Sequence, residues 1–297
     1  AEPEWSRYHL ELPSIHSLVS ANGRLYSIED RASVEHPALP GRFALICRDA
    51  FNGIELWRHP FPDWQPVNIY IKFTPTQVQR QLAAIGDKVY CTPGLDAPIT
   101  VFDARTGDVL RSYPGTERTQ EFVYDQDVLY IVVGDPFDTV GIGRESGTIG
   151  STAFPRAAYG RIIPKLEAPR SSIVAIDAES GRQLWGKEGD ATRAYQGASL
   201  AVQGTNVVYC ADDSLICLDR TTGVQRWRVP CEISLSGRTN TGKPVPLIPG
   251  TTMSLVLEDD AIYLADTRIL AAFAMNDGAK LWTARTRMNH YKAPTCT

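Results

Sequence analysis

The stretch Asp177-Ala-Glu-Ser-Gly-Arg-Gln-Leu-Trp185 decides the fold of this chain, because it recurs along the sequence. Four further copies cover residues 47–57, 101–111, 217–227 and 272–282. Successive repeat glycines are 54, 74, 42 and 55 residues apart, at Gly53, Gly107, Gly181, Gly223 and Gly278. Self-similarity at such spacings is typical of proteins built from one repeated supersecondary unit, and the longer intervals are that unit with loop insertions.

Each copy follows a polar turn and a short β-rich run, as in Asn22-Gly-Arg-Leu-Tyr26 and Gly204-Thr-Asn-Val-Val-Tyr209. Short apolar runs bounded by Gly, Asp and Asn predict strands joined by hairpin turns, and helical periodicity is weak. The 42-residue interval matches one propeller blade of about 40–50 residues. We therefore expect an all-β fold, a β-propeller of four-stranded antiparallel blades with five repeats visible. The chain 1–297 is then a single propeller domain or a fragment of one.

The residues of the repeat have physical reasons to recur. Glycine tolerates the positive φ that a tight turn needs, and an aspartate four residues earlier can accept hydrogen bonds from the turn amides. The tryptophan is expected to pack between neighbouring blades, burying about 150–250 Å² of aromatic surface. The predicted structural positions are Asp49, Gly53, Trp57, Asp103, Gly107, Asp177, Gly181, Trp185, Asp219, Gly223, Trp227, Gly278 and Trp282.

Composition and residue spacing argue against several classes of function. The net charge is −4 and the basic residues form no long run, which argues against nucleic acid as a partner. No stretch approaches 18 consecutive apolar residues, so we expect no membrane-spanning helix. The histidines and cysteines show no metal-binding spacing. Cys210 and Cys217 face each other, within reach of a disulfide, if Asp213-Ser214 forms the turn between them. A different turn leaves two buried thiols.

The five segments resemble the repeat of the pyrroloquinoline-quinone (PQQ) dehydrogenase-like propellers, over roughly residues 17–285. That superfamily includes quinoprotein alcohol dehydrogenases and cofactor-free members such as the outer-membrane-protein assembly lipoprotein of the BAM complex. Two copies depart from the pattern, because Arg111 replaces the tryptophan and Ala274 replaces the aspartate. Related propellers have about seven or eight blades, so the resemblance implies further blades beyond Thr297, or else closure with fewer. By analogy alone, it also implies an extracytoplasmic location in the periplasm or cell envelope.

The same resemblance raises the question of catalysis. A PQQ enzyme needs Ca²⁺ held by carboxylate and amide oxygens and an aspartate as base, and its alcohol-oxidising members carry a disulfide between adjacent cysteines. This chain has no adjacent cysteines, and its recurrent aspartates are expected in turns. We therefore favour a non-catalytic scaffold or protein-interaction module with no cofactor. The alternatives are a PQQ- and Ca²⁺-dependent oxidoreductase and a carbohydrate-binding propeller.

The predicted binding surface lies in loops. The largest excursion, residues 135–170, combines arginine with aromatic residues, which are favoured anchors for protein partners. Its candidate contact residues are Arg144, Phe154, Arg156, Tyr159 and Arg161. A second insertion spans about residues 230–249. A third, Phe61–Gln81, carries Trp64, Tyr70 and Phe73, whose rings would suit a glycan.

Overall fold

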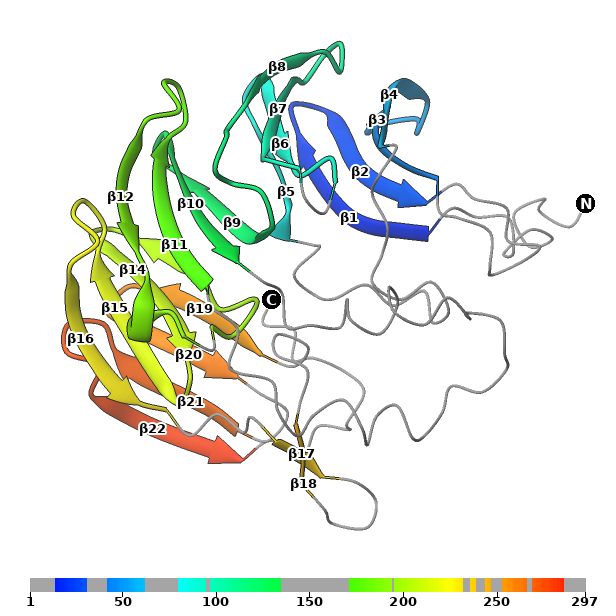
Figure 1. Cartoon of the computed structure of the whole chain (residues 1–297). Coiled ribbons are helices and arrows are strands. Elements are labelled where there is room, and N and C mark those ends of the chain that lie inside the picture. Colours follow the sequence, from blue (N-terminus) through cyan, green and yellow to red (C-terminus); the bar gives the residue numbers. More distant parts are fainter. Residues whose placement is uncertain are drawn as a thin grey trace, which may run out of the picture. The chain divides into compact units, whose positions relative to one another are not determined.

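The structure, a computed structural model, is all-β. It describes residues 14–30, 42–61, 80–94, 97–134, 171–193, 195–231, 236–238, 244–246, 253–265 and 269–285. Within these ranges there are five four-stranded antiparallel sheets, and the strands of each follow one another in sequence order (Figure 1). The predicted fold class and blade construction are confirmed.

Each four-stranded sheet is one blade. Blade 1 comprises β1 (Ser14–Ala21), β2 (Arg24–Asp30), β3 (Phe43–Asp49) and β4 (Glu55–Phe61). Blade 2 comprises β5 (Leu82–Ile85), β6 (Lys88–Cys91), β7 (Thr100–Asp103) and β8 (Val109–Ser112). Blade 3 comprises β9 (Thr119–Asp125), β10 (Val128–Gly134), β11 (Ser171–Asp177) and β12 (Gln183–Lys187). Blade 4 comprises β13 (Ala201–Gln203), β14 (Asn206–Ala211), β15 (Ser214–Asp219) and β16 (Gln225–Pro230). Blade 5 comprises β19 (Ser254–Glu258), β20 (Ala261–Ala265), β21 (Ile269–Ala274) and β22 (Lys280–Arg285).

The repeat forms the corner between the third and fourth strand of every blade. The pairing of these two strands slips by one residue at the same place in all five copies, directly after the small residue that opens the segment. An inserted residue of this kind bends the strand and increases its twist. In four of the five blades this small residue pairs with the corner tryptophan, as Cys47 does with Trp57 and Ala175 with Trp185.

The chain divides into two compact units, one holding blades 1 and 2 and the other holding blades 3, 4 and 5. Within each unit the apolar cores lie between successive blades. In the first unit Tyr26 and Leu45 of blade 1 pack in one cluster with Val89 and Phe102 of blade 2. In the second unit one cluster joins blades 3 and 4 and another joins blades 4 and 5. The expectation of one continuous propeller domain stays a prediction.

Little regular structure other than blades is seen in the described ranges. A 3₁₀ turn covers Gly189–Ala191. Part of the predicted 230–249 insertion forms a two-stranded sheet of β17 (Ser236–Arg238) and β18 (Pro244–Pro246). No described helix has the length and apolar character needed to cross a bilayer.

The register between β14 and β15 decides whether Cys210 and Cys217 can form a disulfide. The turn between β14 and β15 is Asp212-Asp213, so Cys210 pairs with Leu215 and Cys217 pairs with Val208. The two cysteines are therefore not opposite each other, and both are buried free thiols. The Asp213-Ser214 turn, on which a disulfide depended, does not form.

Candidate functional site

Each of four recurrent aspartates accepts hydrogen bonds from the backbone amides of its own turn. Asp49 Oδ1 accepts hydrogen bonds from the amides of Phe51 at 2.8 Å and Asn52 at 3.1 Å. Asp103 does the same two and three residues ahead, at 2.8 and 3.0 Å. Asp219 accepts from two turn amides at 3.0 and 2.9 Å, and Asp177 from the Ser180 amide at 2.7 Å. In these four corners the carboxylate is thus hydrogen-bonded to its own turn.

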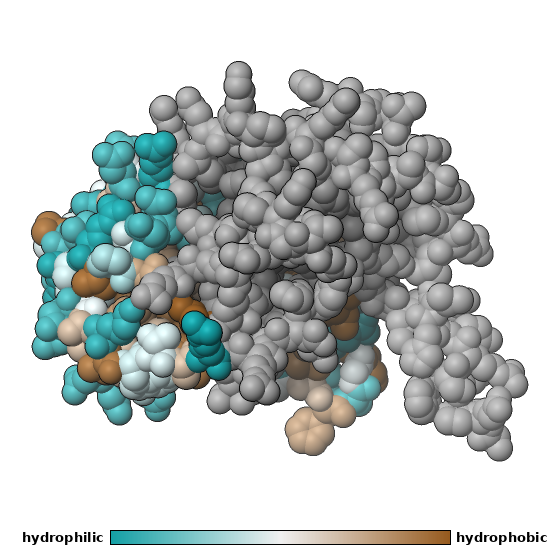
Figure 2. Space-filling view, turned by 90° about the horizontal axis from the view of Figure 1, so that it is seen from below, coloured by the Kyte–Doolittle hydropathy of each residue, from teal (hydrophilic) through white to brown (hydrophobic). Residues whose placement is uncertain are grey.

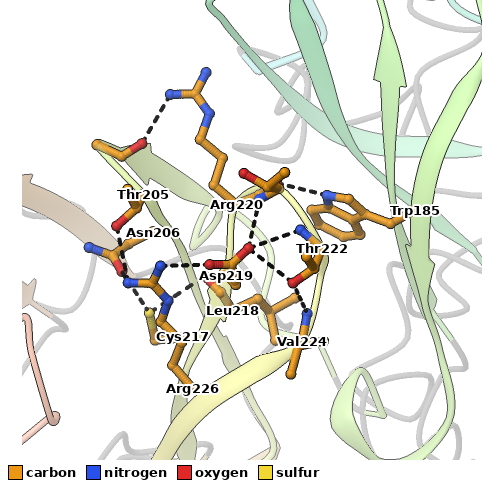
Figure 3. A network of polar contacts seen from close by, with 12 residues as sticks. Trp185, Thr205, Asn206, Cys217, Leu218, Asp219, Arg220, Thr222, Val224 and Arg226 are labelled. Carbon is orange, nitrogen blue, oxygen red and sulfur yellow. Dashed lines mark hydrogen bonds and ion pairs between the residues drawn. The ribbon is translucent and has the colours of Figure 1, made fainter.

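These contacts also set the acidity of the carboxyl groups. Hydrogen bonds from turn amides and hydroxyls stabilise the ionised form and lower the pKa of Asp103 and Asp177. The pKa of Asp219 falls to about 2, first because Arg226 donates to it at 2.6 Å and then because Thr222 does (Figure 3). Carboxylates with lowered pKa values are weak bases at neutral pH. Asp103, Asp177 and Asp219 are therefore poorly suited to abstract a proton from a substrate.

The corner tryptophans connect successive blades. Trp57 Nε1 in blade 1 donates to the carbonyl oxygen of Ala104 in blade 2 at 3.1 Å. In the second unit Trp185 donates to Arg220 O at 2.8 Å (Figure 3) and Trp227 to Met275 O at 3.0 Å. The acceptor always follows the aspartate position of the next corner. Trp57, Trp185 and Trp227 thus each contact the following blade, whereas Trp282 in blade 5 is 43% exposed.

The next blade's corner glycine makes room for each ring. A Cβ on Gly223, whose φ is +69°, would lie 2.6 Å from Cε3 of Trp185. A Cβ on Gly107 would approach Trp57 to 2.6 Å, and one on Gly278 would approach Trp227 to 2.8 Å. These distances are far below van der Waals contact. The repeat therefore needs glycine for two reasons, because the turn requires positive φ and because the neighbouring indole occupies the space of a side chain.

Arg220 adds a polar connection between blades 3 and 4 that the sequence analysis missed. Its guanidinium donates to the Tyr130 hydroxyl at 2.8 Å and to the Asp125 carbonyl at 2.9 Å, and its Nη1 lies 2.7 Å from Asp125 Oδ2. Burial raises the pKa of Tyr130, although Arg220 opposes the shift. The sequence feature that could have indicated this contact is an arginine directly after the repeat aspartate, where three other copies have alanine.

Two buried carboxylates were also missed. Glu29 in blade 1 accepts from Ser27 Oγ at 2.7 Å and from the Arg48 guanidinium. Glu121 of β9 accepts a hydrogen bond from the Tyr195 hydroxyl. No local pattern marks the longer-range contacts, because Arg48 lies 19 residues from Glu29 on another strand and Tyr195 lies 74 residues from Glu121.

Among the described residues no three His, Cys, Asp or Glu side chains are placed to hold a metal ion. Burial raises the pKa of the Cys91 thiol, and that of Cys217 to about 11, so both favour the neutral thiol at physiological pH. The predicted partner-contact residues Arg144, Phe154, Arg156, Tyr159 and Arg161 lie outside the described residues, as do Trp64, Tyr70 and Phe73.

A known protein family matches the part of the chain that holds the last three repeat corners. Residues 169–295, which hold three of the five corners, match the family described as outer membrane protein assembly factor BamB. The three repeats in this range are similar to the PQQ-like β-propeller repeat. No curated protein matches the chain.

The chain is also similar to solved structures at low sequence identity. A europium-containing methanol dehydrogenase has a TM-score of 0.53 and 11% identity, with 92% of this chain and 52% of that chain covered. KlHsv2 with loop 6CD replaced by a Gly-Ser linker has a TM-score of 0.50 and 6% identity, with 94% and 68% covered. BamB from Moraxella catarrhalis has a TM-score of 0.48 and 14% identity, with 91% and 74% covered.

Proposed function

We propose that the chain is a non-catalytic propeller scaffold that binds a protein partner in the cell envelope. The observation that carries the proposal is that the aspartates of four corners are hydrogen-bonded to their own turns. These recurrent carboxylates therefore have a structural role in the blade corners. The match to an assembly factor family supports both the partner class and the location.

The outer strands offer apolar contact points for such a partner. The leucine that precedes the last corner position is exposed in four of the five copies, at Leu56, Leu110, Leu184 and Leu281. Strand alternation turns this leucine away from the side on which the tryptophan packs. Apolar side chains stand among hydrophilic ones on the face that Figure 2 draws. Rigid blades that present apolar side chains at repeated positions suit a protein-binding surface.

Photo-crosslinking tests the partner directly. A photoreactive amino acid replaces Leu56, Leu110 or Leu184 in turn, and adducts formed in envelope extract are identified by mass spectrometry. Glu188, which is exposed just after β12, is the matched control position for Leu184. We expect one discrete protein adduct at the leucines and none at Glu188. Adducts that are absent, or equal at all positions, contradict the proposal.

The competing oxidoreductase is tested separately by adding PQQ and Ca²⁺ to the purified chain. We expect neither saturable PQQ binding nor dye-linked alcohol oxidation. Saturable binding with turnover would overturn the scaffold assignment. No described residue favours the carbohydrate alternative, because the aromatic residues behind it lie outside the described ranges.

A further inference from the structure

Cys210 of blade 4 has a thiol neighbour that the sequence spacing did not indicate. Cys210 and Cys231 are 0% and 3% exposed, and both belong to the apolar cluster between blades 4 and 5. Their thiol groups interact directly with each other, although they are 21 positions apart in the sequence. Both are free thiols in the structure. Two buried thiols in contact have the arrangement from which a disulfide forms.

Strand register explains why these two side chains meet. Cys210 pairs with Leu215, and Leu215 pairs with Val229, so these three side chains share one face of the sheet. Side chains two residues apart on a strand point to the same face, which puts Cys231 on that face as well. The Cys231 amide donates to the carbonyl oxygen of Asp213 at 2.8 Å. The backbone therefore holds Cys231 beside the turn that follows β14, at the same end of blade 4 as Cys210.

Cys217 provides the contrast within the same blade. It lies on the same face and is also fully buried. Its Sγ lies 3.5 Å from Asn206 Oδ1 and 3.7 Å from Leu218 O. Among the described residues its sulfur interacts with these oxygen acceptors and with no second thiol. The geometry therefore selects Cys231, and not Cys217, as the neighbour to which Cys210 can be linked.

We propose that Cys210 and Cys231 form a disulfide when the chain meets an oxidising disulfide compound, R–S–S–R. The Cys231 thiolate attacks one sulfur of that compound, which gives a mixed disulfide and releases one thiolate, R–S⁻. The Cys210 thiolate then attacks the Cys231 sulfur and releases the second R–S⁻. The released thiolates take up the two protons that the cysteines lose. Two cysteine thiols are thereby oxidised to one disulfide, and R–S–S–R is reduced to two R–SH.

The positions of the two cysteines set this order of attack. Cys231 directly follows β16, which is an edge strand of its sheet, and strand ends open more readily than sheet interiors. Cys210 lies on an inner strand, where its amide donates to Ser199 Oγ at 3.0 Å and its carbonyl accepts from the Gln196 amide at 2.9 Å. Burial, and then the neighbouring Cys231 thiol, raise the pKa of Cys210. Because the thiolate is the nucleophile, Cys210 is the weaker group for the first attack.

The disulfide does not depend on the protein partner proposed above. Only the supply of an oxidant rests on the proposed envelope location, because disulfides form and persist in oxidising compartments. The bond would close a loop that contains β15 and β16 and would hold the end of β16 against β14. Purified chain with added oxidised glutathione tests the chemistry by itself, so its failure leaves the scaffold proposal untouched.

Peptide mapping of the oxidised wild-type chain gives the decisive result. The folded chain is equilibrated with oxidised glutathione, unfolded without reductant, alkylated and digested. Trypsin with a protease that cuts before aspartate separates the two alternatives, because Cys210 falls in residues 194–211 and Cys217 in residues 213–218. We expect one disulfide-linked pair that joins residues 194–211 to residues 229–238. Cys210 and Cys231 recovered as thiols or glutathione adducts, or linked to any other cysteine, overturn the proposal.

Single substitutions provide the matched controls. Cys231→Ala removes the proposed partner and should leave residues 194–211 without a linked peptide. Cys217→Ala removes an equally buried thiol from the same face and should leave the linked pair intact. A Cys210 disulfide that survives Cys231→Ala, or a linked pair that is lost in Cys217→Ala, contradicts the assignment. If Cys231→Ala does not fold, the wild-type map still decides, because it identifies both linked cysteines directly.

Discussion

Replacing Gly223 with alanine probes both reasons for the corner glycine. The new Cβ sits at φ +69°, 2.6 Å from Cε3 and 2.7 Å from Cδ2 of Trp185. A left-handed backbone costs a non-glycine residue about 1–2 kcal/mol, and overpacking costs about 1–3 kcal/mol. We expect the free energy of unfolding to fall by about 2–5 kcal/mol for Gly223→Ala. Gly204→Ala in the same blade, at φ +57° with nothing within 4 Å, should lose only the backbone part, about 1–2 kcal/mol.

Urea unfolding followed by circular dichroism and tryptophan fluorescence measures the two losses, with midpoints compared at equal m-values. A double-mutant cycle isolates the contact between the ring and the added methyl group. In a Trp185→Ala background, Gly223→Ala should cost no more than Gly204→Ala. The reasoning is refuted if both glycine variants lose the same stability, or if removing the indole leaves the cost of Gly223→Ala unchanged.

Four other variants examine individual corner contacts. Asp219 has a lowered folded-state pKa of about 2, so its stabilising contribution is present above about pH 4 and is lost as the pH falls toward that folded value. Asp219→Asn should therefore lose less stability than the wild type when the pH falls from about 4 to about 2. Urea unfolding at the two pH values measures the loss for each protein, and equal losses contradict this prediction. Arg220→Met leaves the Asp125 carboxylate and Tyr130 hydroxyl without their cation and should cost about 2–3 kcal/mol in urea unfolding. Arg226→Met removes a more exposed ion pair and should cost under about 1 kcal/mol, so equal losses would count against a special role for Arg220. Ala274→Asp combined with Asp277→Thr restores the motif in blade 5 and should raise the unfolding midpoint through a gain of about 1 kcal/mol. A lower midpoint would show that the fifth corner cannot accept the carboxylate.

The blades were predictable because their determinants are local. The bonds from the aspartate to the turn amides span only two or three residues, and the positive φ of the corner glycine belongs to the turn itself. A sequence pattern can carry such information without knowledge of distant residues. Cys210 and Cys217 mark the limit even at short range, because a shift of one position in the turn changes which residues face each other.

The sequence by itself determined the repeat, the all-β class and the structural role of Asp103, Asp219 and the other corner residues. Only the tertiary structure decided which groups meet across blades. Arg220 bonds Asp125 across 95 residues, and Tyr195 bonds Glu121 across 74. It also showed that Trp282 is exposed while Trp185 is covered, although both occupy the same place in the repeat. The reason is that a turn is closed by its own backbone, whereas an indole on an outer strand is satisfied only by the next blade.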